Sequence, residues 1–229
     1  MSEELIKENK KEQAEQILDL SLKKMPIEYF GFYSLLEPYI STYYKLERFK
    51  KGDDLFITLS KKYEQNLSYY SNLSFNRNSN FSIYTFAEKI ITDTERYRSL
   101  IESALNSNDK NFKSNAIENF IIKTEFVKEI YGNYDYYTLL IPFLEDFYKY
   151  GPPNMSKELY INISSEIKKR LEIFNTMESS NQLNYIENIA NNLYEFRNIL
   201  SVIESYEIDK KLINSEIEFY FDIRKKLIK

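Results

Sequence analysis

The side chains in this sequence that could transfer protons are mainly carboxylates, because the chain contains neither histidine nor cysteine. Those two residue types supply the commonest general base, zinc ligand and thiolate nucleophile. Adjacent carboxylates occur at Glu3–Glu4 and Asp53–Asp54, where each pair begins an expected helix and complements its dipole. Glu145–Asp146 is interpreted as part of a solvated helix face. We therefore expect no catalytic residue and a protein that is not an enzyme.

The sequence offers equally little to a cofactor or a metal ion. Its 4 glycines are isolated along the chain, so no glycine-rich loop is available to hold a phosphate group. The acidic residues do not follow the spacing of a calcium-binding EF-hand. We expect neither a cofactor nor a metal site.

Positive charge is scattered along the chain. Clusters such as Lys168–Arg170 and Arg224–Lys226 alternate with acidic residues along the expected helices, and the net charge is −4. Binding to nucleic acid depends on cations that neutralise phosphates. We therefore expect no nucleic acid as a partner.

No transmembrane segment is expected. The longest apolar runs, such as Leu139–Leu144, are far shorter than the roughly 20 residues that span a bilayer. The N-terminus is charged and lacks the apolar region of a signal peptide. As written, the chain is expected to be soluble and cytoplasmic.

Aromatic residues carry the strongest pattern in the chain, a motif at 33–45 that recurs at 137–149. Each matching position is shifted by the same 104 residues that separate Pro38 from Pro142. The matched pairs are Tyr33 and Tyr137, Leu35 and Leu139, Leu36 and Leu140, Tyr39 and Phe143, Tyr43 and Phe147, Tyr44 and Tyr148, and Lys45 and Lys149. So many matches indicate a duplicated unit.

Neighbouring aromatic residues in this motif cannot share one face of a helix, because adjacent positions point about 100° apart. We expect Tyr43 and Phe147 to pack inward and the residue after each to lie nearer a groove. The candidate partner-binding residues are Tyr44, Tyr148, Lys45 and Lys149. Packing in the core alone is the preferred interpretation of these tyrosines, and contact with a partner is the second.

Helical periodicity dominates the remaining sequence, and no stretch alternates as a half-buried strand would. The expected helices span 3–24, 30–49, 53–73, 82–105, 112–131, 134–150, 155–178, 183–206 and 208–228. Gly52–Asp54 is expected to end one helix and begin the next, and 71–82 to form a loop. Pro38 either kinks its helix or occupies its first turn. The fold class is therefore all-α.

These helices are expected to form a single domain over 1–229. Two duplicated four-helix units span about 3–106 and 110–207, and the helix at about 208–228 caps the array. Tyr43, Phe49, Gly52, Phe56 and Leu59 follow the spacing of the tetratricopeptide repeat, in which a small residue marks the closest approach of two antiparallel helices. The alternative is an irregular bundle of long helices.

Several short motifs in the first half also resemble a known family. They are Ala14–Asp19, Met25–Pro26, Phe32–Tyr33, Glu37–Pro38 and Tyr43–Lys45. Together they resemble the C-terminal helical tail of a bacterial family of multi-spanning membrane proteins of unknown function, which is similar to protein O-mannosyltransferases. The resemblance covers mainly residues 12–75. It implies association with a membrane protein and a periplasmic or membrane-associated location, and it carries over no catalytic residue.

Two functions follow as expectations. The first is a non-enzymatic helical-repeat scaffold that binds a protein or a peptide. The alternative is an accessory domain of a membrane glycosyltransferase-like protein that helps to recruit a substrate or a partner.

Overall fold

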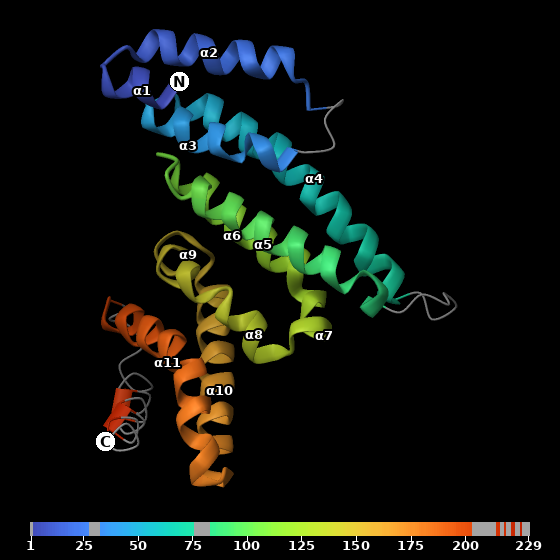
Figure 1. Cartoon of the computed structure of the whole chain (residues 1–229), viewed down its shortest axis with the longest axis vertical. Coiled ribbons are helices and arrows are strands. Elements are labelled where there is room, and N and C mark those ends of the chain that lie inside the picture. The colour runs from blue at the N-terminus through green and yellow to red at the C-terminus, as the bar shows by residue number, and fades with distance from the viewer. Residues whose placement is uncertain are drawn as a thin grey trace. The chain divides into compact units, whose positions relative to one another are not determined.

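The computed structural model describes residues 2–27, 33–75 and 83–202, together with 214, 215, 218, 221, 222 and 225. All regular secondary structure in these residues is helical, which confirms the all-α prediction (Figure 1). The helices gather into two compact units, Met1–Ile130 and Tyr131–Lys229. The helix predicted at 208–228 falls almost entirely outside the described residues.

The first unit is built around one long helix, α4, with shorter helices packed beside it. Figure 1 shows α3 and α5 alongside α4, and α6 beside α5. The elements are α1 (Ser2–Lys7), α2 (Lys11–Lys24), η1 (Tyr33–Leu36), α3 (Glu37–Lys45), α4 (Phe49–Phe75), η2 (Ile83–Phe86), α5 (Ala87–Ala104), α6 (Lys110–Thr124), η3 (Glu125–Val127) and α7 (Lys128–Tyr131), where η marks a 3-10 turn.

The single helix predicted over 3–24 is two helices. Asn9 has φ 59° in the left-handed region, and the backbone N–H of Lys10 donates to the carbonyl of Leu5 at 2.8 Å, which closes α1. Asparagine tolerates this conformation better than most residues do, because its short polar side chain can bond locally. The chain therefore reverses after Lys7 and begins again with α2.

The predicted helix break at Gly52–Asp54 is wrong. Gly52 lies inside α4, and the chain turns earlier, at Glu47, which has φ 62°. There the N–H of Arg48 donates to the carbonyl of Tyr43 and the N–H of Glu47 to that of Tyr44, both at 2.9 Å. These two bonds form a Schellman motif that closes α3. Pro38 occupies the first turn of α3, one of the two positions expected for it.

The core of the first unit contains a row of aromatic rings contributed by η1, α4, α5 and α6. Tyr63 of α4 stacks on Tyr97 of α5 with ring centroids 6.0 Å apart, and Tyr97 meets the edge of Phe120 of α6 at 5.2 Å. Tyr33 of η1 contacts the other side of Tyr63 at 4.9 Å. Offset and edge-on ring pairs add about 0.5–1.5 kcal/mol each beyond their buried area. This row holds α4, α5 and α6 in register.

In the described part of the second unit, three helices and a 3-10 turn pack around α10. Its elements are α8 (Asn133–Thr138), η4 (Ile141–Phe143), α9 (Leu144–Tyr150), α10 (Pro153–Thr176) and α11 (Ser179–Val202). Phe147, Tyr160, Ile163 and Phe174 are fully buried in its core. The guanidinium of Arg170 lies over the ring of Tyr134, 4.6 Å from its centroid, and so links α10 to α8.

The helix predicted over 134–150 is interrupted. Pro142 falls within η4, between α8 and α9, although Pro38 at the matching position lies in the first turn of a continuous helix. Proline lacks a backbone N–H, so either arrangement avoids an unmade helical hydrogen bond. The helix predicted over 112–131 is also divided, into α6, η3 and α7, and within 30–49 the structure has η1 followed by the shorter α3. The helices predicted over 53–73, 82–105, 155–178 and 183–206 are present, with ends displaced by a few residues where the structure describes them.

Candidate functional site: a groove beside helix α4

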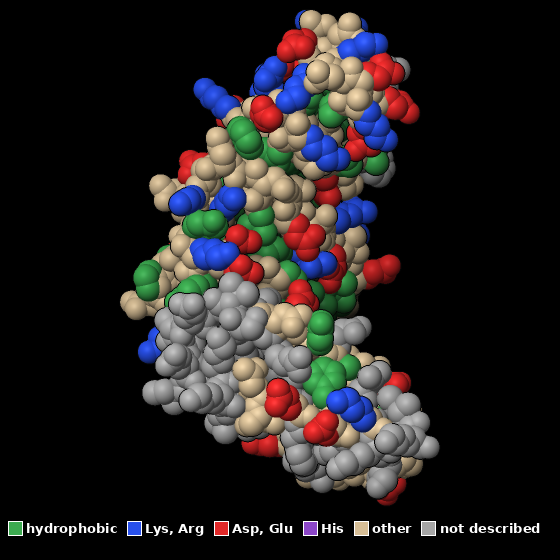
Figure 2. Space-filling view, turned by 90° about the vertical axis from the view of Figure 1, so that its left-hand side faces the viewer, with side chains coloured by type: hydrophobic (Ala, Val, Ile, Leu, Met, Phe, Trp, Pro, Cys, Tyr) green, Lys and Arg blue, Asp and Glu red, His purple; other side chains and the backbone are tan. Residues whose placement is uncertain are grey.

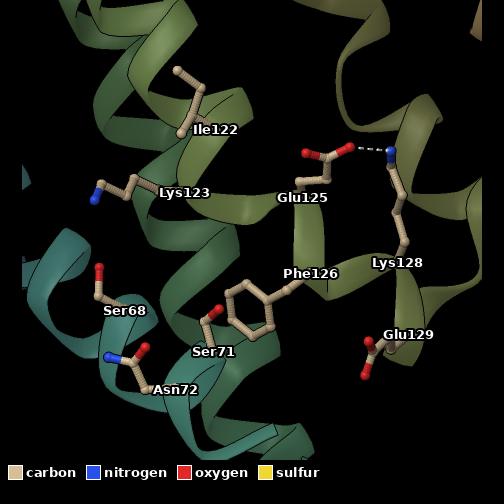
Figure 3. A pocket seen from close by; sticks show the side chains of 9 residues that line it. All are labelled: Ser68, Ser71, Asn72, Ile122, Lys123, Glu125, Phe126, Lys128 and Glu129. Atoms are coloured by element: carbon tan, nitrogen blue, oxygen red, sulfur yellow. Dashed lines mark hydrogen bonds and ion pairs between the residues drawn. The ribbon is translucent and has the colours of Figure 1, made fainter. Parts of the chain in front are cut away.

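A surface groove in the first unit runs between the C-terminal half of α4 and the segment from the end of α6 to α7 (Figure 3). Its main hollow has a volume of about 510 Å³. The side chains that line it are Ser68, Ser71 and Asn72 on one wall and Ile122, Lys123, Glu125, Phe126, Lys128 and Glu129 on the other. A second hollow of about 490 Å³ shares Ser68, Asn72 and Lys123 and extends along α4 to Lys61. The two hollows together are called the α4 groove below.

Helix α4 forms one wall because its two faces differ in character. Leu55, Leu59, Tyr63 and Leu67 are buried and recur every four residues, so they place one face against the core. The side chains that point the other way follow the same helical spacing and border the groove. They are Lys61, Gln65, Ser68, Tyr69 and Asn72.

The opposite wall depends on the tightening of the chain where α6 becomes η3. Asp109 caps the start of α6, because its side chain accepts hydrogen bonds from the N–H groups of Asn111 and Phe112. At the other end the buried hydroxyl of Thr124 donates to the carbonyl of Phe120 at 2.7 Å. The turn that follows brings Phe126 beneath the groove, as Figure 3 shows.

Apolar side chains stand at the rim of the groove. Tyr69 on α4 is 58% exposed and Ile122 on α6 is 55% exposed, although both belong to helices whose core faces are fully covered. Phe126, which lines the main hollow, is half-buried. Exposed apolar groups gathered at a hollow mark interaction sites more often than isolated ones do.

Some polar side chains in the groove already form hydrogen bonds or ion pairs within the protein, and others do not. The carboxylate of Glu64 accepts a hydrogen bond from the hydroxyl of Tyr97 at 2.8 Å, and Glu125 forms an ion pair with Lys128 at 3.1 Å. Among the residues that the structure describes, neither Lys61 nor Lys123 forms an ion pair. The groove therefore presents ammonium, hydroxyl and amide groups beside apolar surface, a combination that can bind a ligand through both polar and apolar contacts.

The predicted position of Tyr44 is wrong. Its side chain is only 6% exposed, and its hydroxyl donates to the carboxylate of Asp53 at 2.8 Å. Burial is the main cause that raises the pKa of the Tyr44 hydroxyl, and the hydrogen bond to Asp53 raises it further. The ring belongs to the core between α3 and α4 and does not face a groove. Tyr43 and Phe147, at 1% and 0% exposure, pack inward as predicted.

The other three candidate residues lie near the surface of their units. Lys45 is exposed and pairs with Glu3 of α1 at 3.0 Å, whereas Lys149 pairs with Glu145 one turn earlier in α9. Tyr148 is half-buried. None of the four candidates lines the α4 groove. Contact of these residues with a partner stays a prediction.

The groove residues were not predicted from the sequence, although a weak signal was present. Tyr69 and Ile122 are apolar residues on faces that helical periodicity assigns to solvent. Tyr69 precedes Tyr70, and Ile122 follows Ile121. The number of apolar residues therefore does not show which residue of each pair points outward. The departure from a clean amphipathic stripe is the signal that could have identified them.

A second group of polar side chains surrounds the aromatic row of the first unit. Glu37 accepts a hydrogen bond from the hydroxyl of Tyr63, and the amide of Asn66 donates to Asp93 at 3.0 Å and to the hydroxyl of Tyr33 at 2.8 Å. Burial raises the pKa of the Glu37 and Asp93 carboxyl groups above their ordinary values, against smaller opposing effects of the hydrogen bonds from Tyr63 and Asn66 and of the Arg96 charge. These hydrogen bonds link η1, α3, α4 and α5.

Comparisons with known proteins identify no relative of this chain: no family model, curated protein or solved structure matches it. In the described part of the chain, no three histidine, cysteine or acidic side chains gather where a metal ion could bind. None of the described helices has both the length and the apolar character needed to cross a bilayer. The resemblance to the tail of a membrane protein family stays an expectation.

Proposed function

We propose that this protein is a non-enzymatic helical scaffold that binds a segment of a protein or peptide in the α4 groove. The observation that carries the proposal is that Tyr69 and Ile122, each more than half exposed, lie on opposite walls of the α4 groove, Tyr69 at one of its two hollows and Ile122 at the other. Burying such groups against a partner contributes roughly 25 cal/mol for each Å² of apolar surface removed from water.

The shape of the site favours a chain segment as its ligand. Lys61 and Asn72 mark the two ends of the groove along α4, and eleven helical residues at 1.5 Å each span about 16 Å. A site of that length, open along exposed side chains, accommodates several residues of a peptide. Peptide recognition in grooves between helices uses apolar anchors of this kind.

The duplicated repeat is part of the same proposal. Positions 104 residues apart in α4 and α10 are buried alike, as for Leu55 and Leu159, Leu59 and Ile163, and Ser60 and Ser164. Gly52 and Ser156 also correspond, and each lies against the preceding short helix. This agreement supports two tetratricopeptide-like helix pairs with an unusually long second helix in each. Repeat proteins of this class serve as scaffolds.

Selection from a displayed library of random twelve-residue peptides tests the proposal with the full chain. The selection should enrich peptides that bind the wild-type protein. The Ile122→Glu variant should bind those peptides at least tenfold more weakly, because a charge replaces an apolar contact at the rim. Ile57→Glu is the matched control, since Ile57 is also an exposed apolar residue but does not line the groove. Failure to enrich any peptide, or equal binding by Ile122→Glu, would contradict the proposed function.

A further inference from the structure

We propose that the occupant of the α4 groove is an acidic segment that carries an apolar anchor. The inference rests on the proposed function and specifies the chemistry of its partner. Carboxylates of the segment would meet Lys61 and Lys123, and its apolar side chain would cover Ile122 and Phe126.

Two acidic side chains at the groove already bond to neighbouring side chains of the protein. Glu64 at the groove is occupied by Tyr97, and Glu125 is occupied by Lys128. The cations between them are not matched in this way: across the described residues, Lys61 and Lys123 make no ion pair. The unmatched charge on this stretch of the groove is therefore positive, although the whole chain has a net charge of −4.

Glu129, the third acidic residue of the groove, lies apart from Lys123. Figure 3 shows Lys123 and Ser68 on one side of Phe126 and Glu129 on the other. The groove is thus polarised, with positive charge toward Lys61 and Lys123 and negative charge at Glu129. A segment bearing carboxylates at one end of its apolar anchor matches this polarity, whereas a basic segment in the same place would face both lysines.

The neutral polar side chains of the groove also suit an acidic segment. Gln65, Ser68 and Asn72 lie on the same face of α4 as Lys61, and their side chains can donate hydrogen bonds to carboxylate oxygens. Figure 2 shows Lys and Arg side chains interspersed with Asp and Glu over the described part of the face drawn, so no patch of a single charge marks that face. Selection instead comes from the local arrangement of donors around the apolar floor.

The composition of the peptides selected above tests this inference separately from the proposed function. Peptides that combine Asp or Glu with an aliphatic or aromatic residue should dominate, and their affinity should fall by about tenfold between low and physiological salt because the charges are partly exposed. Enrichment of neutral or basic peptides that still lose binding to Ile122→Glu would overturn the acidic partner and leave the scaffold proposal intact. No enrichment at all would overturn both.

Charge reversal supplies the decisive variant. Lys61→Glu combined with Lys123→Glu should weaken binding of the acidic peptides by at least tenfold and should enrich basic peptides in a fresh selection. Lys50→Glu is the matched control, because Lys50 is an exposed lysine of α4 that does not line the groove. Unchanged peptide binding after the double reversal would overturn the inference. So would self-association in sedimentation equilibrium that the double reversal abolishes, since a second copy would then be the occupant.

Discussion

The ring of Tyr44 lies directly against the backbone of Gly52, where any other residue would place a side chain. A Cβ atom built on Gly52 would be 2.6 Å from Cε1 of Tyr44, well inside van der Waals contact. The Tyr44 hydroxyl then reaches Asp53 at 2.8 Å. The absence of a side chain at Gly52 therefore lets α3 approach α4 closely and lets a large polar ring enter the core.

Replacing Gly52 with alanine should destabilise the protein. Alanine is favoured over glycine in a helix by about 1 kcal/mol, but overpacking a core costs about 1–3 kcal/mol. The buried ring of Tyr44 is held by its hydrogen bond to Asp53, so it cannot simply swing aside. The net loss in the free energy of unfolding should be up to about 2 kcal/mol. Urea denaturation followed by circular dichroism measures it as a lower midpoint at an unchanged slope.

The same substitution in a Tyr44→Ala background separates steric conflict from other effects. Without the ring, Gly52→Ala should raise stability by about 1 kcal/mol, because only the helix propensity remains. The sign of the effect should therefore reverse between the two backgrounds. If Gly52→Ala destabilises both to the same extent, contact with Tyr44 is not the cause.

The sequence predicted the close helix contact at Gly52 but not what fills it. Repeat spacing predicted that Gly52 is the small residue between two helices, and in the structure the ring of Tyr44 lies against it. The same glycine was also expected to break the helix, which it does not. Packing across α3 decides between these two roles of glycine, and local sequence contains no information about that packing.

The α4 groove was beyond sequence reasoning for a related reason. Periodicity assigns the inward face of each helix, and it placed Tyr43, Phe147 and Leu59 correctly. It does not say which outward faces come together, because that depends on how α4, α5 and α6 pack and on the 3-10 turn after Thr124. The two walls of the groove therefore became neighbours only in the folded unit.

Substituting Glu47 with glycine should stabilise the protein. A residue with a Cβ atom in the left-handed region costs about 1–2 kcal/mol, whereas glycine adopts φ 62° freely. Glycine loses more backbone entropy on folding, by about 0.5–1 kcal/mol, so the net gain should be on the order of 0.5–1 kcal/mol. Thermal or urea denaturation measures the gain.

Alanine at the same position is the control for that result. Glu47→Ala removes the exposed ion pair with Lys11, 3.3 Å in length, but keeps the Cβ atom and its strain. It should not raise stability. Equal stabilisation by both substitutions would show that the acidic side chain, and not the backbone conformation, is unfavourable.

The half-buried carboxyl groups of Glu37 and Asp93 should make folding less favourable as pH rises. Burial is the main cause of their raised pKa values, so the folded protein holds their protons at pH values where the unfolded chain has released them. Their contribution to stability is therefore lost as pH rises from about 4, the ordinary carboxyl range, through the raised pKa values. The double variant Glu37→Gln and Asp93→Asn should gain stability relative to the wild type as pH rises toward 7.

Glu15 provides the opposite control for this measurement. Hydrogen bonds from Lys51 and Arg48 lower the pKa of Glu15, so the stability it contributes is present at neutral pH and lost as pH falls. Glu15→Gln should therefore become relatively more stable toward acid, whereas the Glu37 and Asp93 variant becomes relatively more stable toward neutral pH. Parallel curves of unfolding free energy against pH for all three proteins would refute the assignment.

Two buried serines of α10 should respond in opposite directions to the same substitution. Ser156, 1% exposed, donates its hydroxyl to the carbonyl of Phe147 at 2.8 Å, whereas the hydroxyl of Ser164, 5% exposed, has no partner among the described residues. Losing a satisfied hydrogen bond costs about 1 kcal/mol, and removing an unsatisfied buried hydroxyl relieves about 1–3 kcal/mol of desolvation. Ser156→Ala should therefore lower the urea midpoint and Ser164→Ala should raise it. Alanine's helix propensity favours both variants equally, so the difference between them reports the lost hydrogen bond of Ser156 together with the relieved desolvation of Ser164. Equal midpoints would show that a water molecule satisfies Ser164.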